Sequence, residues 1–268
     1  MTEPYVPYSE ISSKLDLKAG DTLLVASDIT RLTIDALKNK MRFEPDKFID
    51  SLLERVSNGT LLFPAFVNNL SDGGTFDIAH TLPQTGALSM AAFKRIDFIR
   101  TSDPFHSFMV KGKHAEALQA IKNKSTFGDD SVFAFLHQHT AKMLLIDIDL
   151  QHSFTFAHYV EEREGARYRE LKKQFITCID KNSKVSIREI SFFEKKPGVM
   201  IALNGLHDLF LKKGASTETR INGSVFTLID LNKAYELIKN DIHSNGGSNL
   251  HKMSISLFAK TMIKKIIP

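Results

Sequence analysis

The sequence predicts an α/β fold, in which a mixed central sheet is flanked by helices and followed by a smaller, mainly antiparallel β domain. In the first part of the chain, short apolar runs such as 22–26 and 142–148 alternate with segments of helical period, which is typical of a sheet covered by helices. Later, the period changes to two over residues 173–179 and 185–192, and turn residues join these runs. This pattern indicates an antiparallel hairpin.

The expected elements follow the chain in order, and the change of period at Gly165 divides them into two domains, residues 1–165 and 166–268. The first domain is expected to hold strands at 22–26, 60–66, 108–111 and 142–148, and helices at 46–56, 87–95, 113–139 with a break, and 154–164. Pro64 should end or bulge the second of these strands. After the hairpin, a strand at 224–230 leads into a helix at 231–238, and a last amphipathic helix is expected beyond residue 250.

The composition is that of an ordinary globular protein, with 268 residues of which 43% are hydrophobic and 25% charged. The single cysteine, Cys178, excludes an intrachain disulfide, and residues 1–16 do not have the pattern of a secretory signal. No apolar run approaches the roughly 20 residues that span a bilayer. The net charge of +4 suggests anionic ligands but is too mild to indicate nucleic acid. We therefore expect a cytoplasmic protein without a membrane or nucleic-acid partner, and a homo-oligomer stays open.

Two polar segments precede or join the expected elements of the first domain. At Thr85-Gly86 a hydroxyl and a glycine come just before a helix, where unpaired amide groups and the positive end of the helix dipole hold a phosphate or pyrophosphate. An ordinary threonine N-cap explains the same residues. The turn at 100–107 gathers a cation, an imidazole, a carboxylate and three hydroxyls, and turn initiation at Asp103-Pro104 is its structural explanation.

A third segment, residues 155–162, comes just after the apolar strand at 142–148. In sheets with helical crossovers, ligands gather at the carboxyl ends of the strands. On a helix Thr155, His158 and Glu161 share one face, so that the carboxylate can orient the imidazole and raise its basicity. A histidine is the side chain best matched to take a proton near neutral pH. A half-buried histidine paired with a glutamate is the structural alternative.

Taken together and in this order, these segments resemble the aminoglycoside 3-N-acetyltransferase family and its relatives that acylate nucleotide-linked amino sugars. The resemblance covers about residues 15–165 and rests on several motifs. They are residues 20–27, 62–66, Phe76-Asp77 with Pro83, Thr85, Gly86 and Leu88, residues 100–107, Gly112, Gly128 with Ser131 and Phe133, and Thr155 with His158 and Glu161. Beyond residue 165 the match is mainly at 220–223.

The resemblance implies an acyl-CoA co-substrate, no metal, and His158 as a general base oriented by Glu161. The acyl-CoA would be bound by Ser27, Pro64, Thr85, Gly86, Ser102, His106 and Ser107. The acceptor would be bound by Asp28, Asp103, Thr155, Arg220 and Asn222. Ser27 or Thr155 would also stabilise the oxyanion of the tetrahedral intermediate. For Arg220 an anion contact and a structural bridge through Glu218 are left equally open.

The acceptor is the point at which this sequence departs from the family. Family members often carry histidine where this chain has Asp103, and a histidine and a serine where it has Ala26 and Ser27-Asp28. Because the net charge is +4, we expect an anionic acceptor, a nucleotide-linked (dTDP) amino deoxysugar of surface polysaccharide biosynthesis, acylated from acetyl-CoA or a hydroxyacyl-CoA such as 3-hydroxybutyryl-CoA. The alternatives are an aminoglycoside acceptor, as in antibiotic resistance, and a non-catalytic protein that binds acyl-CoA or a nucleotide.

Overall fold

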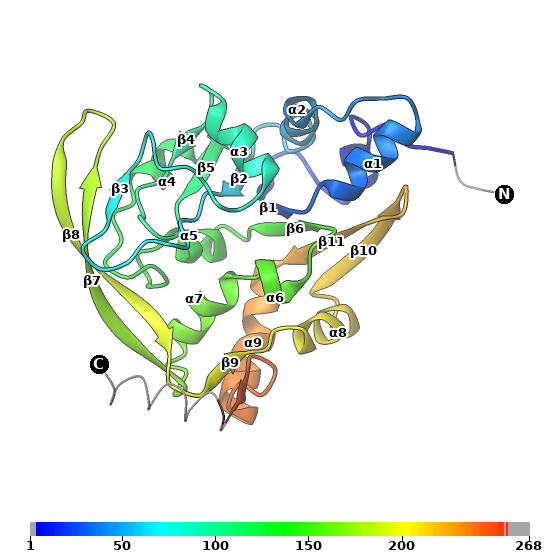
Figure 1. The fold of residues 1–268 in the computed structure, drawn as a ribbon. Helices are drawn as coiled ribbons and strands as arrows, with labels where there is room; N and C mark the ends of the chain where they lie inside the picture. The colour runs from blue at the N-terminus through cyan, green and yellow to red at the C-terminus, as the bar shows by residue number, and fades with distance from the viewer. Residues whose placement is uncertain (1–3, 255, 257–268) are drawn as a thin grey trace.

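The computed structural model describes residues 4–254 and 256. At its centre lies a seven-stranded sheet with the strand order β10-β11-β6-β1-β2-β5-β4 (Figure 1). In chain order these strands are β1 (Thr22–Ser27), β2 (Thr60–Pro64), β4 (Ile99–Arg100), β5 (Phe108–Gly112), β6 (Lys142–Ile146), β10 (Ser216–Ile221) and β11 (Ser224–Asp230). Strand β2 ends at Pro64, as predicted.

Helices cover both faces of this sheet (Figure 1). A 3-10 turn, η1 (Ile11–Lys14), precedes β1. The helices are α1 (Thr30–Lys38), α2 (Pro45–Arg55), α3 (Ala87–Lys94), α4 (Ala115–Ala120), α5 (Val132–Gln138), α6 (Leu150–Ser153), α7 (Phe156–Arg163), α8 (Gly205–Lys212) and α9 (Leu231–Asn245). None of the helices within residues 4–254 combines the length and apolar character that a membrane span requires.

The side chains of β1 are divided between two hydrophobic cores, one on each face of the sheet. Leu23 and Val25 belong to the hydrophobic cluster that includes side chains of α1, α2 and α3, whereas Leu24 and Ala26 belong to the cluster that includes those of α5, α7 and α9. Successive side chains of a strand point to opposite faces, so a strand covered on both sides must be apolar at every position. The same reasoning predicted β6 from its unbroken apolar run, and four of its five residues are buried.

Strand β1 lies at the point where the order of the parallel strands reverses. It pairs in parallel with β2 on one side and with β6 on the other. In open α/β sheets such a reversal leaves a crevice beyond the carboxyl ends of the strands, where ligands bind. Ser27 and Pro64 end two of these strands, and residues 147–149 follow the third.

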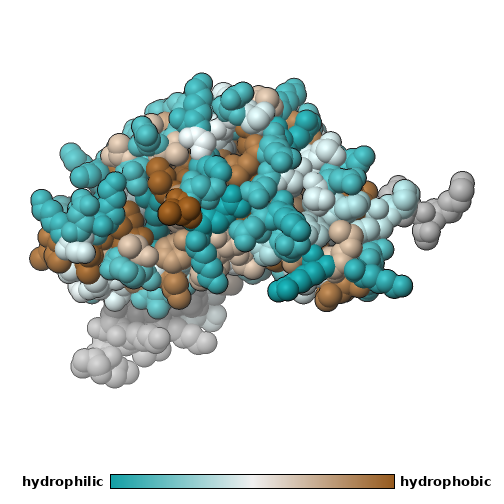
Figure 2. Space-filling model, turned by 90° about the horizontal axis from the view of Figure 1, so that it is seen from above, coloured by the Kyte–Doolittle hydropathy of each residue, from teal (hydrophilic) through white to brown (hydrophobic). Residues whose placement is uncertain are grey.

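A second sheet projects beside the first and contains the predicted hairpin. Its strands are β3 (Thr75–Asp77), β7 (Arg169–Ile179) and β8 (Val185–Lys195), of which β7 and β8 pair antiparallel over their whole length. Seen from above, a largely hydrophilic face is interrupted by hydrophobic patches at its left edge, on the side where the hairpin lies, and nearer its centre (Figure 2). A third, two-stranded sheet pairs β9 (Val199–Ile201) with β12 (His251–Met253).

The structure confirms the predicted fold class and changes some of its details. Helix α1 occupies a stretch for which no element was predicted, and Arg220 lies inside β10, a strand that was not predicted either. Strands β10 and β11, which fall in the predicted 166–268 domain, pair with β6 and so complete the central sheet. The division at residue 165 stays a prediction. The helix expected at the end of the chain lies outside the described residues.

Gly112 is a position where the sheet tolerates no side chain. Its φ is +120°, and a Cβ atom there would lie 2.2 Å from the carbonyl oxygen of Gly59. We expect Gly112→Ala to lower the free energy of unfolding by about 3 kcal/mol, because it combines backbone strain with a clash against neighbouring backbone. Denaturant unfolding measures this loss.

Gly214→Ala is the matched control. Its φ is +67° and the space around it is open, so that only the left-handed conformation opposes a side chain, at about 1 kcal/mol. Equal losses for the two variants would contradict the clash at Gly112.

Candidate functional site

The predicted His158 and Glu161 form a close pair on α7. The Nδ1 atom of His158 lies 2.6 Å from Oε2 of Glu161, whose side chain is fully buried, while 19% of the His158 side chain is exposed. A carboxylate only accepts hydrogen bonds, so Nδ1 must carry the ring proton. The Nε2 atom of neutral His158 is therefore the one with a lone pair for a substrate.

Two residues that the sequence did not single out complete this cluster, Tyr168 and Arg169. The Tyr168 hydroxyl donates to Oε1 of Glu161 over 2.8 Å, and Nε of Arg169 lies 2.7 Å from Oε2. The Arg169 N–H is not aligned with that oxygen, so this contact is an ion pair rather than a hydrogen bond. Their positions at the start of β7 gave no signal in the sequence, because they reach Glu161 only after the chain turns at Gly165.

The contacts among these four residues determine the charges of Glu161 and His158. Burial raises the pKa of Glu161, but His158, Arg169 and Tyr168 together outweigh burial and hold that pKa below its ordinary value. Burial and the cation of Arg169 lower the pKa of His158 by more than Glu161 raises it. At neutral pH the pair thus consists of a charged carboxylate and a neutral imidazole, the state in which a general base works.

A cavity of about 380 Å³, here called the donor cavity, lies at the carboxyl ends of β1 and β2. Its lining is Ala26, Ser27, Pro64, Phe66, Asn68, Gln84, Thr85, Gly86, His106, Ile148, His152, Ser153 and Thr155. Five residues predicted to bind acyl-CoA are brought together here, and Thr155, predicted at the acceptor, joins them. Thr155 lies one helical turn before His158, which is not itself part of this lining.

The structure places the other two predicted acyl-CoA residues elsewhere. The buried Ser107 hydroxyl donates to the carbonyl of Ala65 over 2.8 Å and accepts from Arg100 over 2.9 Å. The Ser102 hydroxyl donates to the carbonyl of Ile121 over 2.6 Å, and this residue lines a different cavity. Both hydroxyls hold the 100–107 turn in place.

The start of α3 and the end of β2 are joined at the donor cavity. The Thr85 hydroxyl donates to the carbonyl of Pro64, and Gly86 has a φ of +99°. A Cβ atom at Gly86 would lie 3.3 Å from the carbonyl oxygen of Ser27, which is closer than most such contacts. The glycine therefore lets the helix start approach β1.

His106 lies in an aromatic surround between the donor cavity and His158. Its ring centroid is 4.5 Å from that of Phe66 and 5.0 Å from that of Phe127, which in turn is 5.4 Å from the ring of His158. Burial lowers the pKa of His106 to about 4, against an opposing effect of Asp103. His106 is therefore neutral at physiological pH and contacts the rings that lead to the base.

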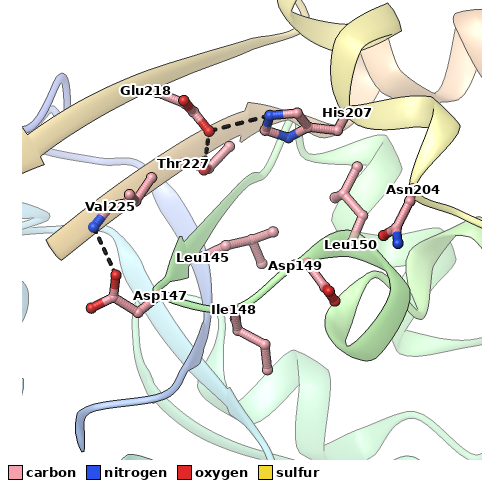
Figure 3. A pocket seen from close by; sticks show the side chains of 10 residues that line it. All are labelled: Leu145, Asp147, Ile148, Asp149, Leu150, Asn204, His207, Glu218, Val225 and Thr227. Carbon is pink, nitrogen blue, oxygen red and sulfur yellow. Dashed lines mark hydrogen bonds and ion pairs between the residues drawn. The ribbon is translucent and has the colours of Figure 1, made fainter. Parts of the chain in front are cut away.

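A second cavity, of about 500 Å³ and here called the acidic cavity, lies at the end of β6 (Figure 3). Its lining is Leu145, Asp147, Ile148, Asp149, Leu150, Asn204, His207, Glu218, Val225 and Thr227. It shares Ile148 with the donor cavity, so the two adjoin. Asp147 and Asp149 were not among the site residues predicted from the sequence.

The carboxylates of the acidic cavity have partners on neighbouring elements. Asp149 accepts from the backbone N–H of His152 over 3.0 Å and lies 2.6 Å from Nδ1 of the same residue, and Nε of Arg31 lies 3.9 Å from Oδ2 of Asp147. The backbone N–H of Val225 donates to Oδ1 of Asp147 over 2.8 Å, and Oδ2 of Asp147 accepts no hydrogen bond from the described residues. Glu218 accepts from the Thr227 hydroxyl over 3.3 Å and lies 3.4 Å from Nε2 of His207 (Figure 3). The cavity is therefore electronegative.

The predicted acceptor residues are scattered around these cavities. Asn222 exchanges two hydrogen bonds with the backbone of Val6, of 2.9 and 2.7 Å, and lines a further cavity together with Asp28. Asp103 is buried and accepts from the backbone of residues 105 and 106 and from Asn123, so its observed contacts lie within and beside the turn. Arg220 is exposed on β10, and its role stays a prediction.

A metal centre was not expected, and the described part of the chain holds no group of three or more histidine, cysteine or carboxylate side chains that could bind one.

Comparison with known proteins identifies the family. Residues 34–242 match the model of the family described as aminoglycoside 3-N-acetyltransferase. The chain belongs to this family. Members are CoA-dependent N-acetyltransferases, so the chain is an acyltransferase enzyme with acyl-CoA as its co-substrate. A search of curated protein sequences gave no match.

Solved structures of aminoglycoside acetyltransferases share the fold over nearly the whole chain. A structure of AAC-IIIb with CoASH has a TM-score of 0.77 at 18% identity and covers 91% of this chain and 99% of its own. Sisomicin-bound AAC-VIa has a TM-score of 0.74 at 17% identity, with coverage of 90% and 99%. The YokD protein from Bacillus subtilis has 0.69 at 19% identity, with 90% and 100%.

These comparisons support the coarser part of the predicted function. The N-acyltransferase reaction and the CoA co-substrate are confirmed for this member of the aminoglycoside 3-N-acetyltransferase family. The expected nucleotide-sugar branch finds no support among them, and the aminoglycoside alternative agrees with them better.

The buried His106 makes stability depend on pH. Its pKa is about 4 in the folded protein and about 6.5 when the chain is unfolded, so below pH 6.5 the unfolded state binds a proton that the folded state does not. The contribution of His106 is thus present above pH 6.5 and lost as the pH falls toward 4. We expect His106→Phe to lose less stability between pH 7 and pH 4.5 than the parent, as measured by denaturant unfolding at each pH.

A neighbouring ring without a titratable group, Phe133, supplies the control for that experiment. Phe133→Leu disturbs the same aromatic surround but leaves His106 in place, so it should lower stability without changing its pH dependence. A His106→Phe curve parallel to that of the parent would exclude this origin of acid sensitivity.

Proposed function

We propose that this enzyme transfers an acetyl group from acetyl-CoA to an amine of a cationic amino sugar of the aminoglycoside class, with His158 as general base. The observation that carries the proposal is the acidic cavity, where Asp147, Asp149 and Glu218 surround a space that adjoins the donor cavity at Ile148. The family of the chain supports the same acceptor.

The local charge favours an aminoglycoside over a nucleotide-linked sugar. The net charge of +4 favoured an anionic nucleotide-linked sugar, but it sums residues over the whole surface. A ligand responds to the charges that line its own cavity, because those at a distance are screened within about 10 Å. A sugar nucleotide would bring its diphosphate against three carboxylates, whereas the ammonium groups of an aminoglycoside would pair with them.

The donor cavity suits the thioester end of acetyl-CoA. Ser27, the Thr85-Gly86 helix start and Thr155 offer hydroxyl and amide groups beside the mostly apolar Pro64 and Phe66. A pantetheine chain is itself an apolar chain with amide groups, and such mixed linings are typical of small-molecule sites. Its volume of about 380 Å³ falls within the range of such sites.

The reaction follows from the geometry of the base. The amine nitrogen attacks the thioester carbonyl carbon, a C–N bond forms, and Nε2 of His158 accepts the proton that the nitrogen loses. The C–S bond then breaks, and the proton passes from His158 to the thiolate of CoA, so that an amide and free CoA leave. Glu161 keeps Nδ1 of His158 protonated and stabilises the imidazolium between these two steps.

The first prediction for this function is that His158→Ala loses turnover by roughly 10²–10⁴-fold, the range for a missing general base. Acetyl-CoA affinity should change little, because the base acts on the acceptor amine. Free thiol release measures turnover, and calorimetry on the same preparation measures donor binding. His139→Ala is the control, since His139 is an exposed histidine at the end of α5 that lines neither cavity. Turnover near that of the parent would remove His158 from this role.

The second prediction concerns the carboxylates. Glu218→Gln and Asp149→Asn should each raise KM for an aminoglycoside by roughly fivefold, the loss of an ion pair worth about 1 kcal/mol, and leave KM for acetyl-CoA unchanged. Glu236→Gln on the exposed face of α9 is the charge-matched control.

The acceptor panel for this experiment contains aminoglycosides and dTDP-linked amino sugars. Turnover of a nucleotide-linked amino sugar, with none of any aminoglycoside, would reverse the proposed acceptor.

A further inference from the structure

We propose that Arg169 is a positioning residue of this reaction. Its buried guanidinium holds Glu161 ionised and keeps the imidazole of His158 neutral, so that Nε2 is free to accept the proton of the amine. The inference rests on the base role proposed for His158 and assigns the group that prepares it.

Arg169 is fixed in place by contacts on two sides. Its side chain is only 3% exposed, and Nη1 donates to the carbonyl of Phe193 on β8 over 2.9 Å. On its other side Nε lies 2.7 Å from Oε2 of Glu161, which is itself fully buried. A buried charge is costly unless an opposite charge compensates it, so each of these two groups depends on the other.

The third contact of Arg169 is with the base itself. Nη2 lies 2.8 Å from Nδ1 of His158, the atom that also faces Oε2 of Glu161 at 2.6 Å. Nδ1 cannot donate to the carboxylate and accept from the guanidinium at once. Without a hydrogen, Nδ1 would direct its lone pair at a carboxylate oxygen that has nothing to donate. Nδ1 therefore keeps its proton and donates it to Glu161. Arg169 then acts on His158 as a nearby positive charge that opposes a second proton on the ring.

A count of charges gives the consequence. With Arg169 present, the buried cluster of His158, Glu161 and Arg169 is neutral while the imidazole is neutral, and protonation of His158 leaves it at +1. Without the guanidinium the same cluster carries −1 and attracts a proton. The other titratable groups that face it are Tyr168, whose hydroxyl donates to Glu161, and His106, which is uncharged at neutral pH because its pKa is about 4.

The His158–Glu161 pair should therefore take up its proton at a higher pH when the charge of Arg169 is removed. An opposite or like charge at this distance moves a titration by roughly 1–3 pH units. Because the pair shares the proton, the measured value belongs to both residues. If the ring of His158 already carried this second proton, the enzyme would have to release it before His158 could accept a proton from the amine.

A purely structural role is the alternative, in which Arg169 only ties β7 to α7. That role predicts a lower melting temperature for any substitution and no change in titration. The two roles differ in a matched set of variants. Arg169→Gln removes the charge but keeps an amide donor, Arg169→Lys keeps the charge but loses the planar fork, and Arg163→Met removes a cation from the exposed end of the same helix.

The experiment records two quantities on the full-length enzyme. The first is the imidazole titration of His158 by NMR, with its signal assigned by loss in His158→Ala. The second is the pH dependence of kcat/KM for an amine acceptor that the parent acetylates. We expect Arg169→Gln to move the His158 titration and the acidic limb of kcat/KM to higher pH by roughly 1 unit or more. Arg169→Lys and Arg163→Met should leave both where the parent has them.

Several results would overturn the inference. They are an Arg169→Gln titration that matches the parent, an Arg169→Lys titration that moves as far as that of the Gln variant, or a parent in which His158 titrates above its ordinary value. The last needs no variant, so the inference stays testable even if Arg169→Gln does not fold. The titration does not use turnover. Failure of this inference is thus distinct from failure of the proposed function, which the activity of His158→Ala tests.

Discussion

The buried negative charge of Glu161 is the constraint on which the site depends. A carboxylate without exposure to water must be compensated, and here a tyrosine hydroxyl, an imidazole N–H and a guanidinium do so from two elements. Each of these contacts also has a consequence for His158: the carboxylate fixes its tautomer, and the guanidinium opposes its protonation. The compensation that allows Glu161 to be buried is thus the same arrangement that suits His158 to the proposed role of general base.

The central sheet places two different cavities at the carboxyl ends of its parallel strands. Strand β1 has parallel neighbours on both sides, so the crevice at its carboxyl end is open to ligands from β2 and from β6. The β2 side carries the helix start at Thr85-Gly86, whereas the β6 side carries the carboxylates of residues 147 and 149. Two substrates of different charge can therefore approach one reacting centre without competing for the same groups.

The acceptor illustrates why a total charge is a poor guide to a ligand. The +4 of the whole chain suggested an anionic substrate, yet the cavity at the end of β6 is lined by Asp147, Asp149 and Glu218. Glu218 comes from β10, far along the chain from the other two, and joins them only because β11 pairs with β6 and β10 with β11. Electrostatic recognition at close range follows this local set of charges.

The sequence by itself determined the fold class, the family resemblance and the His158–Glu161 pair. These depend on regular spacing: apolar period for the strands and helices, and a separation of three residues for two side chains on one helix face. Only the tertiary structure decided the rest. It places Tyr168 and Arg169 in contact with Glu161 and assembles the acidic cavity. It also shows that Asn222 bonds to the backbone of Val6, and that the hydroxyls of Ser102 and Ser107 bond to backbone carbonyls around a turn. Such contacts join residues from separate elements, and the direction in which a polar side chain points is set by the packing of those elements, which no local pattern records.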